Sequence, residues 1–114
     1  MNEKIKKEKL ESIFNYFGVS VQETKLIEEL GELITAISRL QQEVMMIATG
    51  IQEKDEKRIN KLMKNVIEEL ADVDILKDQL IEGYDAREEF EEAVEYKIKR
   101  TLIRIGSGYY GKDS

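Results

Sequence analysis

The amino-acid sequence predicts an all-α fold: four helices around a long antiparallel helical hairpin core, assembled as an oligomeric helical bundle. The chain of 114 residues contains no Pro, and 37% of its residues are charged. Its apolar residues recur at intervals of three and four, which is the period of an amphipathic helix. Glycines mark the expected breaks between helices, at Gly18, Gly50 and Gly83 and from Gly106 onward.

The first two helices are predicted from apolar spacing and from a capping signal. Residues 3–17 carry an apolar face at helical spacing: Leu10, Ile13, Phe14 and Phe17. Ser20 is expected to cap the second helix, and Glu23, three residues later, to complete a capping box. The second helix ends near Thr49, and its apolar seam keeps a strict spacing of four and three: Leu26, Leu30, Leu33, Ile37, Leu40, Val44 and Ile47.

The last two helices repeat this rhythm. The third is predicted over residues 53–82, where Lys77 interrupts an apolar seam: Ile59, Met63, Val66, Leu70, Val73 and Leu80. The fourth is predicted over residues 86–105, with this apolar set: Phe90, Val94, Ile98, Leu102 and Ile105. Residues 1–105 are expected to form one domain, and residues 106–114 a flexible polar tail.

The length of the hairpin predicts an oligomer. Helices of about 30 residues are ~45 Å long. The two shorter helices cannot cover all the apolar surface of such a hairpin, so a homodimer or homotetramer is expected.

Several residue types that carry common enzyme chemistry are absent. The chain has no Cys and no His, which excludes disulfides, thiolate nucleophiles, Cys or His zinc sites and a His general base. Its 24 acidic and 18 basic residues give a net charge of −6, so no nucleic acid partner is expected. No apolar signal region or membrane-length apolar run occurs, so we expect a cytoplasmic protein without a membrane partner.

Two acidic motifs lie 40 residues apart, IEELGE at residues 27–32 and IEELAD at residues 67–72. Carboxylates three residues apart lie about 60° from each other around a helix, close enough to serve one site. With Leu30 and Leu70 at heptad position a, Glu28 falls at position f, away from the seam. Four other carboxylates then share one edge of the hairpin: Glu29 and Glu69 at g, and Glu32 and Asp72 at c.

The heights of these four carboxylates agree with the position of the turn. Residues that are level in an antiparallel hairpin have numbers that add up to about twice the turn position. Glu29 with Asp72 gives 101, and so does Glu32 with Glu69. This places the turn at residues 50–51, where the glycine pattern also places a break. Edge, height and turn together predict that the four side chains converge.

Four converging carboxylates repel one another unless a cation neutralises them. Oxygen ligands favour Mg²⁺, or Mn²⁺, over zinc, and Mg²⁺ commonly binds substrate phosphates. The expected chemistry is therefore attack by a metal-activated water on a phosphorylated substrate. The alternative is that each acidic pair is a solvated face balanced by Lys and Arg. Two matching pairs argue against it, and the nearest cations on the second helix are only Lys25 and Arg39.

The two motifs resemble those of MazG-like nucleoside triphosphate pyrophosphohydrolases, of the all-alpha NTP pyrophosphatase superfamily. The matching residues are EELGE at 28–32 with Leu33-Ile34-x-Ala36-Ile37, EELAD at 68–72 with Val73, and the lead-in Tyr16-Phe17-Gly18-x-x-x-Gln22. The resemblance covers roughly residues 14–82. It implies Mg²⁺-dependent hydrolysis of a nucleoside or deoxynucleoside triphosphate to the monophosphate and pyrophosphate, by a dimer or tetramer. It also implies the metal ligands, the same four that the heptads select: Glu29, Glu32, Glu69 and Asp72. Glu28 would orient or deprotonate the attacking water.

Cationic residues near the predicted site are candidates for phosphate binding. Lys25 lies one turn before the first motif, where it either meets a phosphate oxygen or balances the acids. Lys97 and Arg100, with Arg104, form a cationic strip on the fourth helix. Cations near a helix C-terminus also complement the helix dipole, so a purely structural role stays open.

Polar and aromatic residues supply candidates for base recognition. Tyr16 lies off the apolar face of the first helix and is a candidate to stack on a base. Gln22 either bonds a base edge or simply sits in a first turn. Tyr109 and Tyr110 either fold over a site or belong to a disordered tail.

A function without catalysis stays open from the sequence. The same helical scaffold would serve as an oligomerisation module, or as a regulatory module that binds a nucleotide without turnover. The response of the acidic motifs to substitution and to Mg²⁺ separates these functions.

Overall fold

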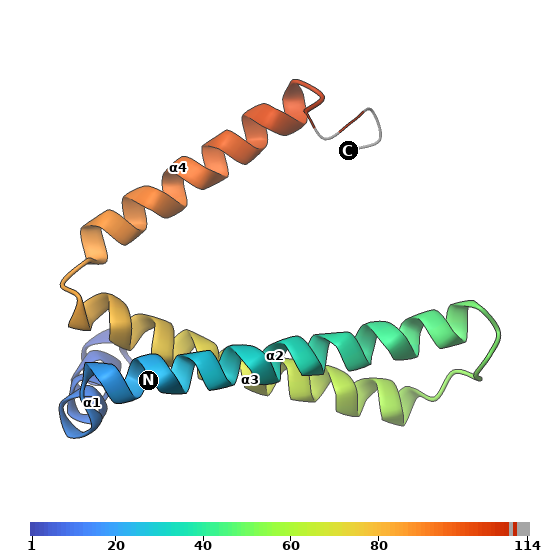
Figure 1. Cartoon of the computed structure of the whole chain (residues 1–114), viewed down its shortest axis with the longest axis horizontal. Helices are drawn as coiled ribbons and strands as arrows, with labels where there is room; N and C mark the ends of the chain where they lie inside the picture. Colours follow the sequence, from blue (N-terminus) through green and yellow to red (C-terminus); the bar gives the residue numbers. More distant parts are fainter. Residues whose placement is uncertain (110, 112–114) are drawn as a thin grey trace. The chain divides into compact units, whose positions relative to one another are not determined.

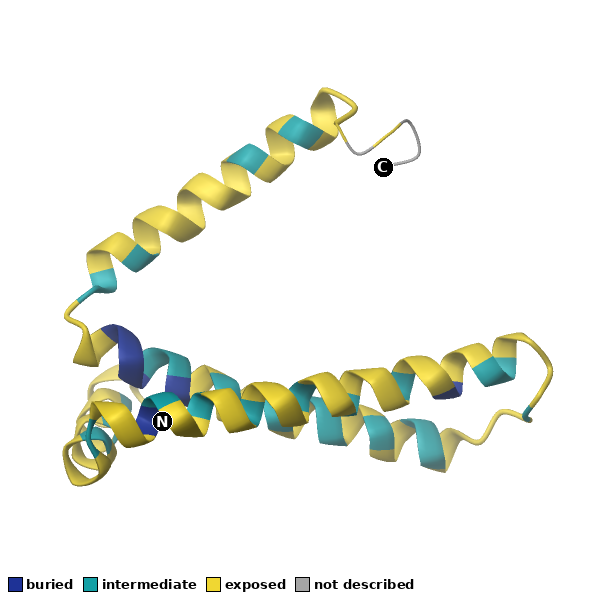
Figure 2. Ribbon diagram, in the orientation of Figure 1, coloured by how far each residue is buried: buried dark blue, intermediate teal, exposed yellow. Residues whose placement is uncertain are grey.

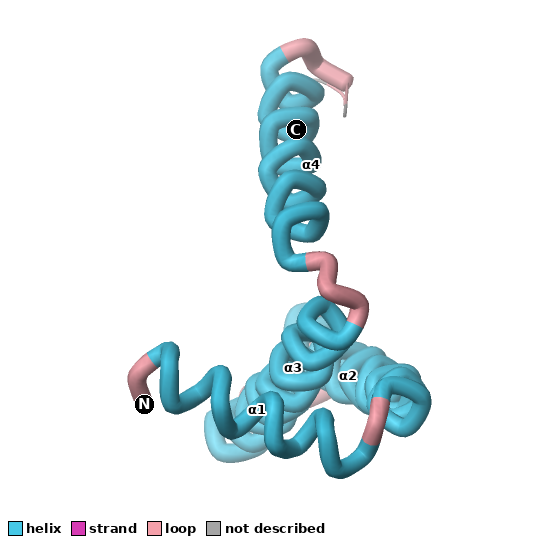
Figure 3. The backbone as a smooth tube through the Cα atoms, turned by 90° about the vertical axis from the view of Figure 1, so that its left-hand side faces the viewer, coloured by secondary structure: helices cyan, strands magenta, loops and turns pink. Residues whose placement is uncertain are grey.

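The computed structural model describes residues 1–109 and 111, and this part of the chain forms four helices and no strand (Figures 1 and 3). The helices are α1 (Glu3–Phe17), α2 (Val19–Ala48), α3 (Glu56–Gly83) and α4 (Arg87–Gly106). The predicted all-α fold class is thereby confirmed. None of these helices combines the length and the apolar character that crossing a membrane requires.

The chain divides into two compact units, residues 1–80 and residues 81–114. The first unit holds α1, α2 and most of α3, and with them the predicted site. The second holds the end of α3, α4 and the C-terminal residues. The assignment of residues 1–105 to one domain stays a prediction.

A side-chain cap and a glycine set the two ends of α1. The side chain of Asn2 caps α1 by accepting a hydrogen bond from the Ile5 N–H at 2.8 Å. Gly18 ends α1 with φ +83° and donates its N–H to the Phe14 carbonyl at 2.8 Å. A positive φ is easy for Gly and strained for other residues, so the chain turns here directly into α2.

The predicted capping box of α2 is wrong. Gly18 is the N-cap residue of α2, no side chain caps this end, and Ser20 is already helical. The Ser20 carbonyl accepts the Thr24 hydroxyl at 3.2 Å within the first turns of the helix. The sharp turn at Gly18 starts the helix two residues earlier than the capping-box pattern indicates, because no extended residue remains to act as a side-chain cap.

The other helix boundaries follow the predicted breaks closely. Gly50, with φ +77°, lies in the loop after α2. α3 begins at Glu56, three residues later than predicted, because Asp55 caps it: its carboxylate accepts the Arg58 N–H at 3.2 Å. α3 ends at Gly83, and Asp85 adopts φ +53° before α4 begins.

α2 and α3 lie side by side as the predicted antiparallel hairpin, and α1 crosses the end opposite the turn (Figures 1 and 3). Two polar contacts fix the register. Near α1, the Gln22 amide donates to the Gln79 carbonyl oxygen. Near the turn, Arg58 Nη2 lies 2.8 Å from Glu43 Oε2. The numbers of each pair add up to 101, so the predicted register is confirmed.

Only half of the predicted α2 seam faces α3. The following residues are partly buried along the contact line: Leu26, Leu33, Leu40 and Ile47. The other half is exposed, and Leu30 and Val44 keep 41% and 51% of their surface (Figure 2). Glu29, Ala36 and Glu43 occupy the contact line instead. The prediction is corrected by a rotation of α2 of roughly half a residue, about 50°, because the contact line keeps half of the seam and shifts by one position in the other half. The rotation turns Glu29 and Glu43 toward α3.

The second unit is built around α4. Arg87 Nη2 pairs with Glu82 Oε1 at 2.8 Å across the turn between α3 and α4. The Arg104 guanidinium lies 4.6 Å from the centre of the Tyr109 ring, a cation–π contact that holds the end of α4 to the following residue stretch. Residues 110 and 112–114, including the predicted role of Tyr110, lie outside the described part of the chain.

Candidate metal centre

Three carboxylates meet across the hairpin, Glu29 and Glu32 from α2 and Glu69 from α3. Each offers one oxygen, and the three oxygens all lie within 4.8 Å of one another. Glu29 and Glu32 share a face because they are three residues apart, and Glu69 is level with Glu32 in the hairpin register. The sequence predicts this convergence, and the structure shows it for these three residues.

The spacing and chemistry of this cluster fit a small divalent cation. Mg²⁺ holds oxygen ligands at about 2.0–2.1 Å, so two opposite ligands lie about 4.2 Å apart. Adjacent ligands in the same octahedral shell lie about 3 Å apart. The three oxygens, within 4.8 Å of one another, are near enough for side-chain rotation to bring them around one such cation. The donor set contains oxygen alone, which suits Mg²⁺ or Mn²⁺ and not a thiolate- or imidazole-seeking metal.

Two oxygens of the cluster are buried and lack a partner. Glu29 Oε2 and Glu69 Oε2 are shielded from solvent and have no hydrogen-bond partner when both groups are ionised. Ionised carboxylates only accept hydrogen bonds, so Glu29 and Glu69 satisfy each other only if one of them is protonated. A buried acceptor without a donor costs free energy, which a proton or a cation recovers.

The electrostatics of Glu29 reflect this shortage of positive charge. Burial raises the pKa of Glu29 from 4.5 to about 7, with further contributions from hydrogen bonds to Glu69 and Glu32 and from the charges of Glu32 and Asp72. Every contribution acts in the same direction because each disfavours the negative charge. Without a cation, Glu29 is therefore protonated in a substantial fraction of the molecules near neutral pH.

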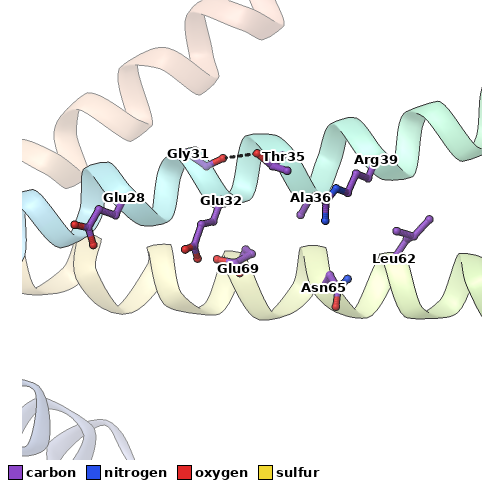
Figure 4. A pocket seen from close by; sticks show the side chains of 9 residues that line it. All are labelled: Glu28, Gly31, Glu32, Thr35, Ala36, Arg39, Leu62, Asn65 and Glu69. Atoms are coloured by element: carbon purple, nitrogen blue, oxygen red, sulfur yellow. Dashed lines mark hydrogen bonds between the residues drawn. The ribbon is translucent and has the colours of Figure 1, made fainter.

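The other two acidic candidates lie beside the cluster. Asp72 is exposed and is not one of the three clustered carboxylates, although its charge acts on Glu29. Glu28, whose heptad position points away from the seam, lines the groove next to the cluster in the structure (Figure 4). The rotation of α2 explains this position, because it moves the whole acidic flank toward α3.

The cluster lies at one end of a groove of about 530 Å³ between α2 and α3. α2 contributes one wall: Glu28, Gly31, Glu32, Thr35, Ala36 and Arg39. α3 contributes the other: Leu62, Asn65 and Glu69. Figure 4 shows the acids toward one end of the groove and Arg39 with Leu62 toward the other. The groove thus joins an acidic end to an uncharged stretch that ends at one Arg.

Comparisons of the chain with protein-family models, curated proteins and solved structures give no match. The likeness to MazG-like pyrophosphohydrolases therefore rests on the sequence motifs alone.

Of the remaining predicted substrate residues, the three in the first unit do not line this groove. Gln22 is buried and bonded to Gln79, of which 2% is exposed. Tyr16 is 82% exposed on α1, and Lys25 is exposed on α2; neither lines the groove. Lys97 and Arg100 lie on α4, in the second unit, where Arg100 stacks on Tyr96 at 5.7 Å.

Six of the nine groove residues are absent from the sequence-based site candidates, among them Arg39 and Asn65. A signal for both exists in the spacing. Arg39 follows Glu32 by seven residues and Asn65 precedes Glu69 by four, so each lies on the same helix face as an acid of the cluster. Both lie outside the acidic motifs, so a search by motif passes over them.

Proposed function

We propose that the protein is a cytoplasmic, Mg²⁺-dependent hydrolase that cleaves a nucleoside or deoxynucleoside triphosphate to the monophosphate and pyrophosphate. The single observation that carries this proposal is the meeting of Glu29, Glu32 and Glu69, with oxygens within 4.8 Å and two of them buried without a partner. Glu29, Glu32, Glu69 and the adjacent Asp72 would hold the cation. The MazG-like motifs supply the reaction type.

Different residues of the chain would have different roles in such a reaction. A bound Mg²⁺ would contact phosphate oxygens and offset the charge that develops on them. Glu28 lines the groove beside the cluster and has no hydrogen bond or ion pair with another described residue, so its carboxylate is available as a base. The oxygen of the attacking water bonds to the α-phosphorus. The bond between this phosphorus and the oxygen that bridges the α- and β-phosphates breaks, and pyrophosphate leaves. Glu28 takes the proton of the water.

A panel of ribo- and deoxyribonucleoside triphosphates with Mg²⁺ or Mn²⁺ tests this function. Pyrophosphate and a monophosphate are the expected products, and Glu32→Gln is expected to abolish their release while circular dichroism keeps its helical signal. Glu68→Gln is the matched control, because Glu68 is exposed and pairs with Lys64 instead of joining the cluster. Release of orthophosphate would mean that another bond is cut, and no release from any nucleotide would refute the proposal.

We also propose that the chain forms a homodimer or homotetramer through an apolar face of α2 and α3 that includes the exposed part of the predicted seams. This apolar face consists of the following residues of α2 and α3: Ile27, Leu30, Ile34, Ile37, Val44, Met45, Met63, Ile67 and Leu70. Each of the nine keeps more than a third of its surface exposed. Together they expose on the order of 900 Å², close to the ~800 Å² that each partner contributes to a standard interface.

The same face favours a second candidate function, an oligomerisation or nucleotide-binding regulatory module without turnover. Under that function the helices associate through their apolar face and the acids contribute no catalysis. Glu32→Gln would then not impair the function of the protein. It would reduce the repulsion among the acidic side chains, and the thermal stability of the protein would rise. Thermal melting with and without Mg²⁺, alongside the nucleotide panel, separates the two candidates.

A further inference from the structure

The end of the groove opposite the acids differs in chemistry from a phosphate site. In the hairpin register Asn65 is level with Ala36, and Leu62 is level with Arg39, as Figure 4 shows. Leu62, Ala36 and Asn65 are partly buried there, and none of the three is charged. Arg39 is the sole cation among the nine groove-lining residues. One cation over an apolar floor, with three Glu residues in the same groove, is a poor site for a second polyanion.

Arg39 is nevertheless placed to meet a ligand. It has no hydrogen bond or ion pair with another described residue. Figure 4 shows its guanidinium nitrogens turned toward Ala36, back along the groove in the direction of the acids. This is the usual direction of a helical side chain, toward the N-terminus of its helix. Its Cα lies seven residues, or ~10 Å, along α2 from that of Glu32.

We propose that Arg39, with Leu62 and Asn65, forms the nucleobase subsite, and that Arg39 selects bases with a carbonyl oxygen at purine C6 or pyrimidine C4 over bases with an amino group at that position. This inference rests on the proposed function, because the acids place the phosphates at the other end of the groove. A planar guanidinium stacks on or borders a flat base, while Leu62 supplies an apolar surface beneath it. Asn65 offers both a donor and an acceptor to the remaining edge of the nucleoside.

The direction of the selectivity follows from the hydrogen-bond inventory of Arg. Its guanidinium has five donors and no acceptor, so it pairs with O6 of guanine or O4 of thymine and uracil. The amino groups of adenine and cytosine present a donor at the same place, and two facing donors leave both without an acceptor. Arg pairing of this kind discriminates between bases by about ten- to one-hundred-fold. In an open groove we expect the lower figure, roughly tenfold.

Isothermal titration with the four deoxynucleoside monophosphates, the products of the proposed reaction, tests the subsite without turnover. The wild-type protein with Mg²⁺ is expected to bind dGMP and dTMP about tenfold more tightly than dAMP and dCMP. Arg39→Ala and Arg39→Lys are both expected to bring this ratio near one, because Lys keeps the charge and loses the planar fork. Lys64→Ala is the matched control: it removes one exposed α3 cation that does not line the groove.

The outcomes separate this inference from the proposed function. If Arg39→Ala weakens the binding of all four nucleotides equally and Arg39→Lys restores it, Arg39 contacts the phosphate and the inference is overturned. The inference is also overturned if Arg39→Ala leaves the affinity ratio unchanged, or if none of the four nucleotides binds measurably. If the ratio behaves as expected and no triphosphate is hydrolysed, the catalytic proposal fails and the base subsite stands. If pyrophosphate is released and the affinity ratio does not change in the Arg39 variants, the base subsite fails and the catalytic proposal stands.

Discussion

Replacing Glu29 by Gln is expected to stabilise the metal-free protein at neutral and alkaline pH and to leave its stability nearly unchanged in acid. The reason is the pKa of Glu29, which rises from 4.5 to about 7 in the folded protein. As the pH rises through this interval, the unfolded chain gives up its Glu29 proton before the folded chain does. The free energy of unfolding therefore falls between pH 4.5 and pH 7 and stays lowered above it. Gln keeps the shape and removes the ionisation.

The size of this effect follows from the two pKa values. The interval from 4.5 to about 7 corresponds to at most about 3 kcal/mol of free energy. Glu29 is only partly buried and its neighbours Glu32 and Asp72 are exposed, so water and salt screen the repulsion. We therefore expect a gain of ~1–2 kcal/mol above pH 7, or several degrees in Tm for a domain of this size.

Thermal unfolding followed by circular dichroism, with a chelator, measures this gain across the pH range. Glu68→Gln is the control, because it removes an exposed carboxylate outside the cluster. Saturating Mg²⁺ is expected to reverse the ranking at pH 8, because the wild-type site binds the cation and gains stability while Glu29→Gln lacks one ligand. An equal gain of Glu29→Gln at pH 4.5 and pH 8 would refute the role of ionisation. If Mg²⁺ raises the Tm of Glu29→Gln as much as it raises the Tm of the wild-type protein, Glu29 is not a metal ligand.

Further variants test the hairpin and its apolar face. Arg58→Ala is expected to lower the free energy of unfolding in urea titrations, because Glu43 is 7% exposed and among the described residues then keeps only the Gln52 amide as a partner. The double variant Glu43→Leu/Arg58→Met is expected to regain most of this loss, and no recovery would contradict a purely electrostatic cause. Leu30→Lys with Leu70→Lys is expected to reduce the molar mass measured by light scattering to that of a monomer, since it places charges on the apolar face; an unchanged mass would place the interface elsewhere.

The helices and their pairing are predictable from the sequence because they depend on local chemistry. Gly18 and Gly50 take positive φ values, which only Gly adopts without strain, so the amino-acid pattern alone marks both breaks. The hairpin register follows from the same turn, and Gln22–Gln79 and Glu43–Arg58 confirm it. The start of α2 is less predictable, because Gly18 serves both helices at once and removes the need for a side-chain cap.

The site is predictable in its acids and not in the rest of its groove. Glu29, Glu32 and Glu69 are found by spacing alone because helical periodicity sets which side chains share a face, and the turn fixes the register of the two helices. Arg39 and Asn65 carry no motif, and their importance depends on which flank of each helix faces the groove. That depends on the rotation of α2, which the apolar pattern places roughly half a residue, about 50°, away from its position in the structure.

This rotation links the acidic centre to the apolar face. An apolar seam with Leu30 and Val44 at its centre would bury more hydrocarbon between α2 and α3 than the observed contact line does. The structure instead turns Glu29 and Glu43 inward, where Arg58 neutralises only Glu43. Hydrophobic burial alone does not favour this arrangement in an isolated hairpin. Under the proposed function, a cation bound at Glu29 would compensate the buried acids, and a second copy of the chain packed on Leu30 would cover the apolar residues that the rotation exposes. Both interactions would stabilise the observed arrangement.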